Sequence, residues 1–554
     1  MATIRCRRPM RRWWPGCAIS SDRLGCLQIG RRGGRMRHLK SLVLAAALAL
    51  TAGAASAQAW FGAPTPGPVS PPDKPTFHAG PASYGPAPAH VRPADDARGA
   101  LSGEKMMADV RRIVGFSLER KAAGDLLYGR ISGLPGEKAV VDWAVARLKA
   151  DGLTDAHAEP YVSEAPLWLP VSYELRAMTD GSPDVVLASA VPIRNRTLKP
   201  AAAEGPLVFV GRGSAAELAN VDVKGRVAVV NVVPDDSLFA AREKGVAREL
   251  EKRGAVGVIN AVESPGNLLY YDNRYGCDAA PCFLVGGDDG AFLESVIGRA
   301  AKAGKTVRMK LTLQAEERPN LTAWNGVATI PGMSDEVVIV NAHADAWFDG
   351  ADDNADGLAV QLALADYFAH RKEKPARTLV FMVSGGHHTA VGAAAFIKAH
   401  PEIIKKTVLV MNLEHLAQIA VTQAARLDPA APGGYESGVW TANTTETTKQ
   451  AGAVNAGPYV WALMGKASKR YGVVTSYEPT PSAPGDLGAY IRAGLPSAQL
   501  ISSEVYYHSS GDTPSTISVP GLERAAAFYA GFIEDVAKAP REKLKGPPPA
   551  APGR

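Results

Sequence analysis

Four short apolar runs, separated by helical stretches, constrain the fold of this chain more than any other feature. They are Val337–Val340, Leu379–Val383, Val408–Met411 and Ala498–Ile501, and each is nearly continuous in apolar residues. Such runs are typical of strands that are buried on both faces of a parallel sheet. The helical stretches between them include 357–370, which is apolar almost all round. The sequence therefore predicts an α/β fold with a mostly parallel central sheet flanked by helices.

Side chains that can bind metals follow these runs directly. In open α/β sheets, ligands bind beyond the carboxyl ends of the strands. Imidazole and carboxylate groups suit zinc, and one shared carboxylate can bridge two ions. The candidates at these strand ends and in the Asp-rich loop 349–357 are His343, Asp345, Asp353, His387, His388, Glu414 and His508.

Each candidate also has a simpler interpretation. A single histidine after a strand is more often a core or surface residue than a ligand, and the Asp-rich loop could be a turn and a helix cap. That loop could also bind calcium, although the apolar helix after it does not fit an EF-hand. The simpler interpretations must explain every strand-end position separately, so we favour a metal centre.

The segment from about 160 to 316 differs from the rest of the chain. Short β runs such as Leu207–Val210 and Val227–Val233 alternate there with one helical run, Ala240–Arg253. We interpret this segment as a separate α+β insert. Its two cysteines, Cys277 and Cys282, are the only ones outside the first 57 residues, and we expect them to form a disulfide.

The N-terminal region resembles an export signal. A short basic stretch from Arg35 to Lys40 precedes the apolar core Leu42–Leu50, which is too short to span a bilayer, and Ala55-Ser-Ala57 is a cleavage pattern. We expect cleavage after Ala57 and a secreted or periplasmic protein without a stable membrane anchor; an uncleaved N-terminal anchor is the less favoured alternative. Met36 is a candidate for the true start of the protein.

Charge argues against a nucleic-acid partner. Residues 1–57 hold ten Arg and one Lys against a single acid, so their net charge is +10, whereas the whole chain carries only +6. The remainder is therefore net acidic, and no basic face suggests nucleic acid. Nothing in the sequence favours one oligomeric state over another.

The order of these motifs resembles the aminopeptidase Y/glutamate carboxypeptidase family of di-zinc exopeptidases, the twenty-eighth metallopeptidase family. The shared pattern is His-x-Asp, Gly-Ala-x-Asp-Asn-x-x-Gly, a doubled residue, Asn-Leu-Glu and Tyr-His-x-x-x-Asp-Thr. Tyr128-Gly-Arg-Ile-Ser-Gly-Leu-Pro-Gly-Glu137 and Gly485-Asp-Leu-Gly-Ala-Tyr490 are similar to further family segments. The insert resembles a protease-associated domain in Val223–Val230, Lys252–Ile259 and Pro281–Gly287.

The resemblance, together with the Pro-rich composition of 58–102 and 541–554 and the N-terminal signal pattern, predicts a division of the chain into domains. The catalytic domain would comprise two segments with the protease-associated domain inserted between them. The predicted parts are 1–57 (extension plus signal peptide), 58–102 (Pro-rich disordered linker), 103–160 and 317–540 (catalytic domain), 161–316 (protease-associated domain) and 541–554 (Pro-rich tail).

The resemblance also implies roles for the candidate residues. His343, the bridging Asp353 and Glu414 would hold one zinc ion, and Asp353, His388 and His508 the other. Asp345 would orient His343 through its carboxylate, and Tyr507 would stabilise the oxyanion of the tetrahedral intermediate. Two ions would activate a water molecule and polarise the scissile carbonyl of a peptide substrate.

His387-His388 departs from the family pattern, which has Glu-Glu at this point. The first glutamate of that pair is the general base and the second is a ligand. Neutral imidazole can ligate zinc, and a histidine with a pKa near 6.5 can act as a base, so His388 and His387 are compatible with both roles. The exchange also removes negative charge, so the site could instead bind metal without efficient hydrolysis.

Three functions are therefore compatible with the sequence. We favour an exported zinc exopeptidase, more specifically an aminopeptidase, because the other metal positions are all filled. The alternative is a catalytically impaired homologue that acts as a binding protein. Acyl transfer at a single zinc, as in glutaminyl cyclases, is less favoured because the insert resembles that of peptidases.

Overall fold

The computed structural model describes residues 60–69, 78–79, 93, 96, 98–163, 165–194, 201–234, 241–264, 266–386, 391–427, 435–477, 485–502 and 505–546. All of them belong to one compact unit, Ser56–Arg554. The predicted signal peptide, its cleavage site and the pair His387-His388 lie outside the described residues. Within the described ranges, no helix combines the length and the apolar character that crossing a membrane requires.

One eight-stranded sheet contains all four predicted buried strands. Its strand order is β18-β17-β19-β14-β12-β13-β11-β2. The central strands β19, β14, β12 and β13 run parallel, whereas β11 pairs antiparallel with β13 and with β2, and β17 pairs antiparallel with β19. The strands are β2 (His157–Val162), β11 (Thr322–Ile330), β12 (Val337–His343), β13 (Thr378–Ser384), β14 (Thr407–Leu413), β17 (Lys449–Val454), β18 (Thr475–Tyr477) and β19 (Ser497–Ile501). The α/β prediction is confirmed, with a parallel centre and mixed edges.

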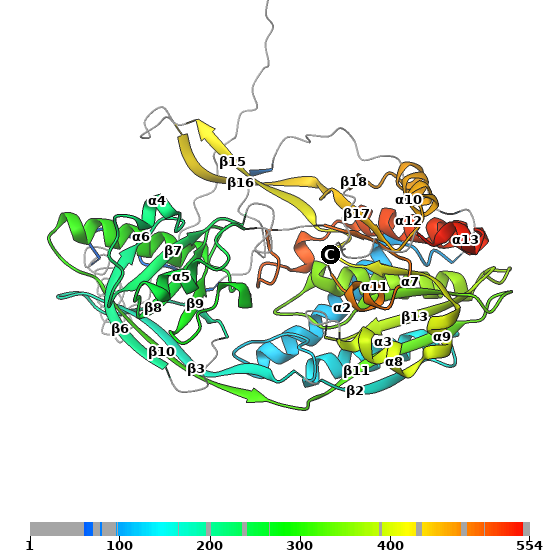
Figure 1. The fold of residues 1–554 in the computed structure, drawn as a ribbon. Helices are drawn as coiled ribbons and strands as arrows, with labels where there is room; N and C mark the ends of the chain where they lie inside the picture. Colours follow the sequence, from blue (N-terminus) through cyan, green and yellow to red (C-terminus); the bar gives the residue numbers. More distant parts are fainter. Residues whose placement is uncertain are drawn as a thin grey trace, which may run out of the picture. The chain divides into compact units, whose positions relative to one another are not determined.

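Helices cover both faces of this sheet, which explains why its central strands contain nearly continuous apolar runs (Figure 1). Val338 and Val340 belong to a core shared with α2 (Gly103–Ala122), α3 (Pro135–Ala150), α7 (Asp356–Ala369), α10 (Pro458–Tyr471) and α12 (Val519–Lys538). Val337 and Ile339 belong to a second core, shared with α8 (Val391–Ala399) and α11 (Gly488–Arg492). Successive residues thus alternate between the two cores, as the pleat of a strand requires. Two short helices complete the domain, α9 (Pro401–Lys406) and α13 (Arg541–Leu544).

The segment predicted as an insert contains a second eight-stranded sheet, with the order β4-β3-β10-β6-β7-β8-β9-β5. All its strands lie within 167–318, and its helices are α4 (Ala215–Leu218), α5 (Val246–Lys252) and α6 (Gly287–Lys302). The strands are β3 (Leu167–Met178), β4 (Val185–Val186), β5 (Val191–Pro192), β6 (Ala201–Phe209), β7 (Val227–Val232), β8 (Gly257–Val262), β9 (Cys282–Val285) and β10 (Arg308–Arg318). Its classification as a protease-associated domain stays a prediction. A third, small sheet has the order β1 (His78–Ala79), β16 (Tyr435–Glu446) and β15 (Ile419–Leu427).

Cys277 and Cys282 are joined by a disulfide, with their Cα atoms 5.8 Å apart, which confirms the expected pairing. The helix predicted over 240–253 is shorter than expected. It begins only at Val246, because Gly245 has a φ of 88°, which is incompatible with a right-handed helix. Helix α6 was not among the expected elements of the insert.

Two terminal predictions need correction. The predicted disordered linker 58–102 does not hold at Trp60, which is buried with its ring centroid 5.2 Å from that of Phe292. The predicted Pro-rich tail, 541–554, begins too early. Leu544 is buried, and its carbonyl accepts a hydrogen bond from the amide of Gly457. In both places one large apolar side chain finds a partner that is distant in sequence, which local composition does not indicate.

Candidate metal centre

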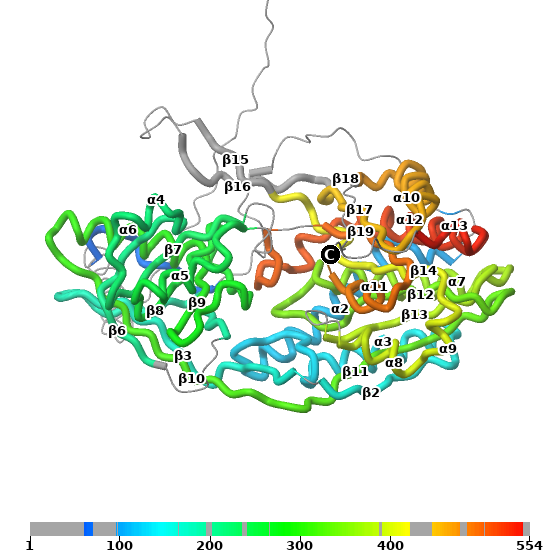
Figure 2. Tube along the Cα trace, viewed as in Figure 1, coloured from blue at the N-terminus to red at the C-terminus, as the bar shows by residue number. Residues whose placement is uncertain are grey.

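The parallel strands bring candidate ligands from distant parts of the sequence to one edge of the sheet. β12 lies between β13 and β14, and Figure 2 shows the three strands side by side. His343 is the last residue of β12, and Glu414 directly follows β14. The register pairs Asn341 with Asn412, so His343 and Glu414 emerge at the same edge.

Three imidazoles converge there on the carboxylate of Asp353, which lies in the short irregular turn η2 (Ala351–Ala355). Nε2 of His343 lies 3.3 Å from Asp353 Oδ1, Nε2 of His415 lies 3.4 Å from the same oxygen, and Nε2 of His508 lies 3.1 Å from Oδ2. Glu414 Oε1 is 3.9 Å from Nε2 of both His343 and His415. Each of these five side chains is at most 5% exposed.

This arrangement fits zinc on two grounds. Tetrahedral zinc with ligands at 2.0–2.1 Å places neighbouring ligand atoms about 3.3 Å apart, which is close to the observed separations. The Nδ1 atoms of His343 and His415 lie 3.0 Å and 3.1 Å from the backbone carbonyls of Asp345 and Ser502. A carbonyl can only accept, so Nδ1 carries a proton, and Nε2, which faces the carboxylates, is the nitrogen that could bind a metal. Histidine ligands of metals typically make such an outer hydrogen bond.

Four of the predicted ligands, His343, Asp353, Glu414 and His508, are therefore close together. The predicted fifth, His388, and the predicted base His387 lie outside the described residues. Asp345 is near the site, but its carboxylate Oδ1 is 3.8 Å from His343 Nδ1, and the shorter contact comes from its backbone carbonyl.

His415 is the residue that the sequence analysis missed. It follows Glu414 directly, and a φ of 52° turns its side chain into the site. A backbone in this region is uncommon for residues other than glycine, and no local pattern indicates it. Burial lowers the pKa of His415, but the carboxylates of Asp353, Asp352 and Glu414 outweigh burial and raise it well above the usual value.

Buried carboxylates join the loop that carries Asp353 to the loop that carries His415. Asp512 accepts hydrogen bonds from the amides of Asp352 and Asp353, at 2.8 and 3.0 Å. Asp352 accepts from the amide of Gln418 at 3.0 Å, and Asp356 from the amide of Ala417 at 2.6 Å. Burial and the nearby Asp352 raise the pKa values of Asp356 and Asp512 well above the usual range. The positions of Asp353 and His415 are thus fixed relative to each other.

Arg130 gives the motif Tyr128–Glu137 a structural role. Its guanidinium is fully buried and donates hydrogen bonds of 2.8–2.9 Å to the carbonyls of Ala344, Asp349 and Gly350. The hydroxyl of Tyr128 donates to Asp349 Oδ1 at 2.7 Å. Burial lowers the pKa of Arg130 to about 10, so the group stays charged at neutral pH and holds the loop between His343 and Asp353.

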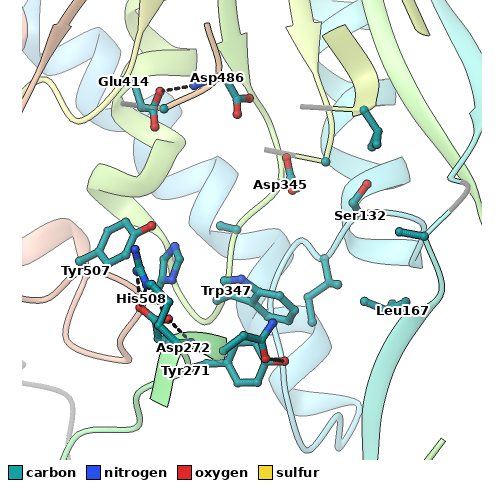
Figure 3. A pocket seen from close by; sticks show the side chains of 18 of the residues that line it. Ser132, Leu167, Tyr271, Asp272, Asp345, Trp347, Glu414, Asp486, Tyr507 and His508 are labelled. Carbon is teal, nitrogen blue, oxygen red and sulfur yellow. Dashed lines mark hydrogen bonds and ion pairs between the residues drawn. The ribbon is translucent and has the colours of Figure 1, made fainter. Parts of the chain in front are cut away.

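The segment that begins at Gly485 positions Glu414. Glu414 Oε2 accepts hydrogen bonds from Asn412 Nδ2 at 2.6 Å and from the amide of Asp486 at 3.2 Å, the latter drawn in Figure 3. Gly485 has a φ of 79°, and a Cβ there would lie 2.2 Å from Glu414 Oε2. Only glycine therefore allows the backbone to approach the carboxylate this closely.

A cavity of about 590 Å³ opens onto the metal centre and is lined by Glu414, His415 and His508. Part of its wall is aromatic and apolar, and Figure 3 shows Trp347, Tyr271 and Leu167 around it. The rings of Tyr271 and Trp347 are 4.5 Å apart. Tyr271 belongs to the insert, and its amide donates to the carbonyl of His508 at 3.0 Å. The insert thus forms part of the cavity wall.

Tyr507 lines the cavity beside the metal centre. Its ring stacks on the imidazole of His508 with centroids 3.6 Å apart. Burial and the carboxylate of Asp353 raise the pKa of Tyr507 well above the usual value, so its hydroxyl keeps its proton and can donate a hydrogen bond.

The comparisons with known proteins agree with this geometry. Residues 325–533, which include the five clustered side chains, match the model of peptidase family M28. This segment is a peptidase family M28 domain. The protein is therefore related to peptidases, whose substrates are peptides and proteins.

Two solved structures share the fold over most of this chain, and a carboxypeptidase is similar to it in sequence. A peptidase M28 precursor from Shewanella amazonensis is 19% identical with a TM-score of 0.56, and the match covers 81% of this chain and 98% of that one. A zinc aminopeptidase from Bacillus subtilis is 18% identical with a TM-score of 0.51, covering 80% and 98%. Carboxypeptidase Q from Bos taurus is 20% identical over 424 residues, 73% of this chain and 82% of that protein.

Proposed function

We propose that the protein is an exported zinc-dependent exopeptidase, and more specifically an aminopeptidase, that holds two zinc ions. The observation that supports this most is the convergence of three buried imidazoles and Glu414 on the carboxylate of Asp353. Both oxygens of Asp353 face an imidazole, so this carboxylate is suited to bridging two ions. Export rests on the N-terminal sequence pattern, 35–57.

In this proposal, bound zinc, Tyr507 and His387 have different roles in peptide hydrolysis. Bound zinc supplies Lewis-acid chemistry and lowers the pKa of a water molecule. Tyr507 donates a hydrogen bond to the carbonyl oxygen that becomes negatively charged. His387, by its position in the motif, accepts the proton of the attacking water and returns it to the leaving amine. The apolar wall excludes water from the substrate.

The charges that line the cavity favour a substrate with a free amino group. Asp345 and Asp486 line the cavity next to the metal centre. The two arginines of the lining are each paired with a carboxylate, Arg194 with Glu317 and Arg274 with Asp272. A carboxypeptidase needs a cation for the terminal carboxylate of its substrate, and these arginines are already engaged. The aromatic wall of Trp347 and Tyr271 suits an apolar terminal side chain.

A substrate panel with purified zinc-loaded protein tests this proposal. We expect hydrolysis of leucyl and phenylalanyl p-nitroanilides, and no hydrolysis of the same compounds after N-acetylation. Release of the C-terminal residue from N-acetylated peptides would instead indicate a carboxypeptidase. Absence of hydrolysis from both groups of substrates would favour the impaired homologue that acts as a binding protein.

A further inference from the structure

His415 lies among the donor atoms around one metal position, where the family pattern provides only three ligands. We propose that His415 is itself a metal ligand and that its Nε2 completes a closed, four-ligand zinc site with His343, Asp353 and Glu414. The inference rests on the proposed zinc dependence, but it concerns metal binding and not hydrolysis.

The donor geometry supports this assignment. The ligand atoms of His343, Glu414 and His415 all lie within 4.8 Å of one another. Asp353 Oδ1 lies 3.3 Å and 3.4 Å from Nε2 of His343 and His415, and Glu414 Oε1 lies 3.9 Å from both nitrogens. Each of the two imidazole nitrogens thus faces both carboxylates, at separations of 3.3–3.9 Å that begin at the value of about 3.3 Å expected between tetrahedral zinc ligands. His508 faces the other oxygen of Asp353 and belongs to the second position.

The backbone holds the His415 ring in this orientation. Nδ1 lies 3.1 Å from the carbonyl of Ser502, and the hydroxyl of Ser502 donates in turn to the carbonyl of His415 at 2.7 Å. Asp352 and Asp356 bind the amides of the three residues that follow His415. The left-handed backbone at His415 costs free energy and persists because these contacts hold it.

A closed site has a functional consequence. Structural zinc sites have four protein ligands, whereas catalytic sites keep one position open for water or substrate. The zinc bound by His343, Asp353, Glu414 and His415 would therefore position Asp353, and the open position would belong to the second ion, beside His508.

Zinc affinity measured by competition with a chelator tests the assignment without reference to hydrolysis. The informative variant is His415→Asn, because an asparagine amide can replace Nδ1–H toward Ser502 and provides no atom in the place of Nε2. The matched control is His157→Asn, which changes an exposed histidine paired with Glu159. We expect His415→Asn to weaken binding of one zinc by more than the 10–100-fold typical of losing an outer hydrogen-bond partner, and the control to match wild type.

Equal zinc stoichiometry and affinity in His415→Asn and wild type would overturn the assignment and leave His415 as an ion-pair partner of Asp353. If His415→Asn does not fold, anomalous diffraction from zinc-loaded wild type decides. The assignment requires zinc about 2.0–2.1 Å from His415 Nε2, and zinc beyond bonding distance would overturn it. Zinc loss in His415→Asn combined with an inactive wild type would contradict only the proposed function.

Discussion

Asp353 is the residue on which the proposed zinc site depends most, because both of its carboxylate oxygens face an imidazole. Replacing it with alanine should lower the zinc content of both positions, whereas His343→Ala should lower the zinc content of one. Metal analysis of dialysed protein by mass spectrometry checks both expectations, with His157→Ala as the control. Full zinc occupancy in Asp353→Ala would remove the basis of the two-ion arrangement.

His387 and His388 should differ in their effects, because the motif assigns them to the water and to the ion respectively. We expect His387→Ala to lower kcat roughly 10²–10⁴-fold with little change in bound zinc, the usual loss for a positioned proton acceptor. His388→Ala should lose zinc. Steady-state kinetics together with metal analysis separates the two effects. Full peptidase activity in His387→Ala would exclude this residue as the base.

At the scale of elements, helix α3 places a buried carboxyl group next to the site. Glu137 accepts hydrogen bonds from Ser132 Oγ at 2.8 Å and from the amide of Gly133 at 2.7 Å. Burial, with a contribution from Asp345, raises its pKa from 4.5 to about 8. The folded protein therefore keeps a proton on Glu137 that the unfolded chain loses above about pH 4.5.

Because only the folded protein keeps this proton on Glu137, the free energy of unfolding should fall as the pH rises. Between pH 4.5 and 8 the unfolded state binds fewer protons than the folded state, so rising pH should destabilise wild type relative to Glu137→Gln. The difference in the free energy of unfolding between wild type and Glu137→Gln should change by at most about 1.4 kcal/mol per pH unit, and this change should stop above about pH 8. Urea unfolding of the zinc-saturated proteins from pH 5 to 9 measures it, with exposed Glu104→Gln as the control. If the difference in the free energy of unfolding between wild type and Glu137→Gln stays constant over this range, the pKa of Glu137 is not raised.

At the scale of the whole molecule, the N-terminal sequence predicts export. The apolar core Leu42–Leu50 and the pattern Ala55-Ser-Ala57 should direct cleavage after Ala57, so the mature protein would begin at Gln58. N-terminal sequencing of the exported protein checks this expectation. A mature protein that still contains Met36 would contradict it, and the apolar core would then act as an anchor.

The sequence predicted those parts of the molecule in which local pattern and tertiary environment agree. Strands β12, β13, β14 and β19 are buried on both faces, and such burial produces continuous apolar runs. The positions of His343 and Glu414 follow from the strand ends alone. His415 could not be predicted, because its placement depends on a left-handed backbone that buried carboxylates stabilise. Tyr271 reaches the cavity because its amide donates a hydrogen bond to the carbonyl of His508, which is distant in sequence. No local sequence pattern indicates this contact.

Zinc reconstitution tests the central claim most directly. Metal-stripped protein is titrated with Zn²⁺ while release of p-nitroaniline from leucyl p-nitroanilide is followed, with Asp353→Ala measured in parallel. The account predicts no activity without zinc, a rise to a plateau as zinc binds, and no recovery in Asp353→Ala at the same zinc concentrations. Bound zinc without hydrolysis of any free-amino substrate, or equal activity in Asp353→Ala, would contradict it.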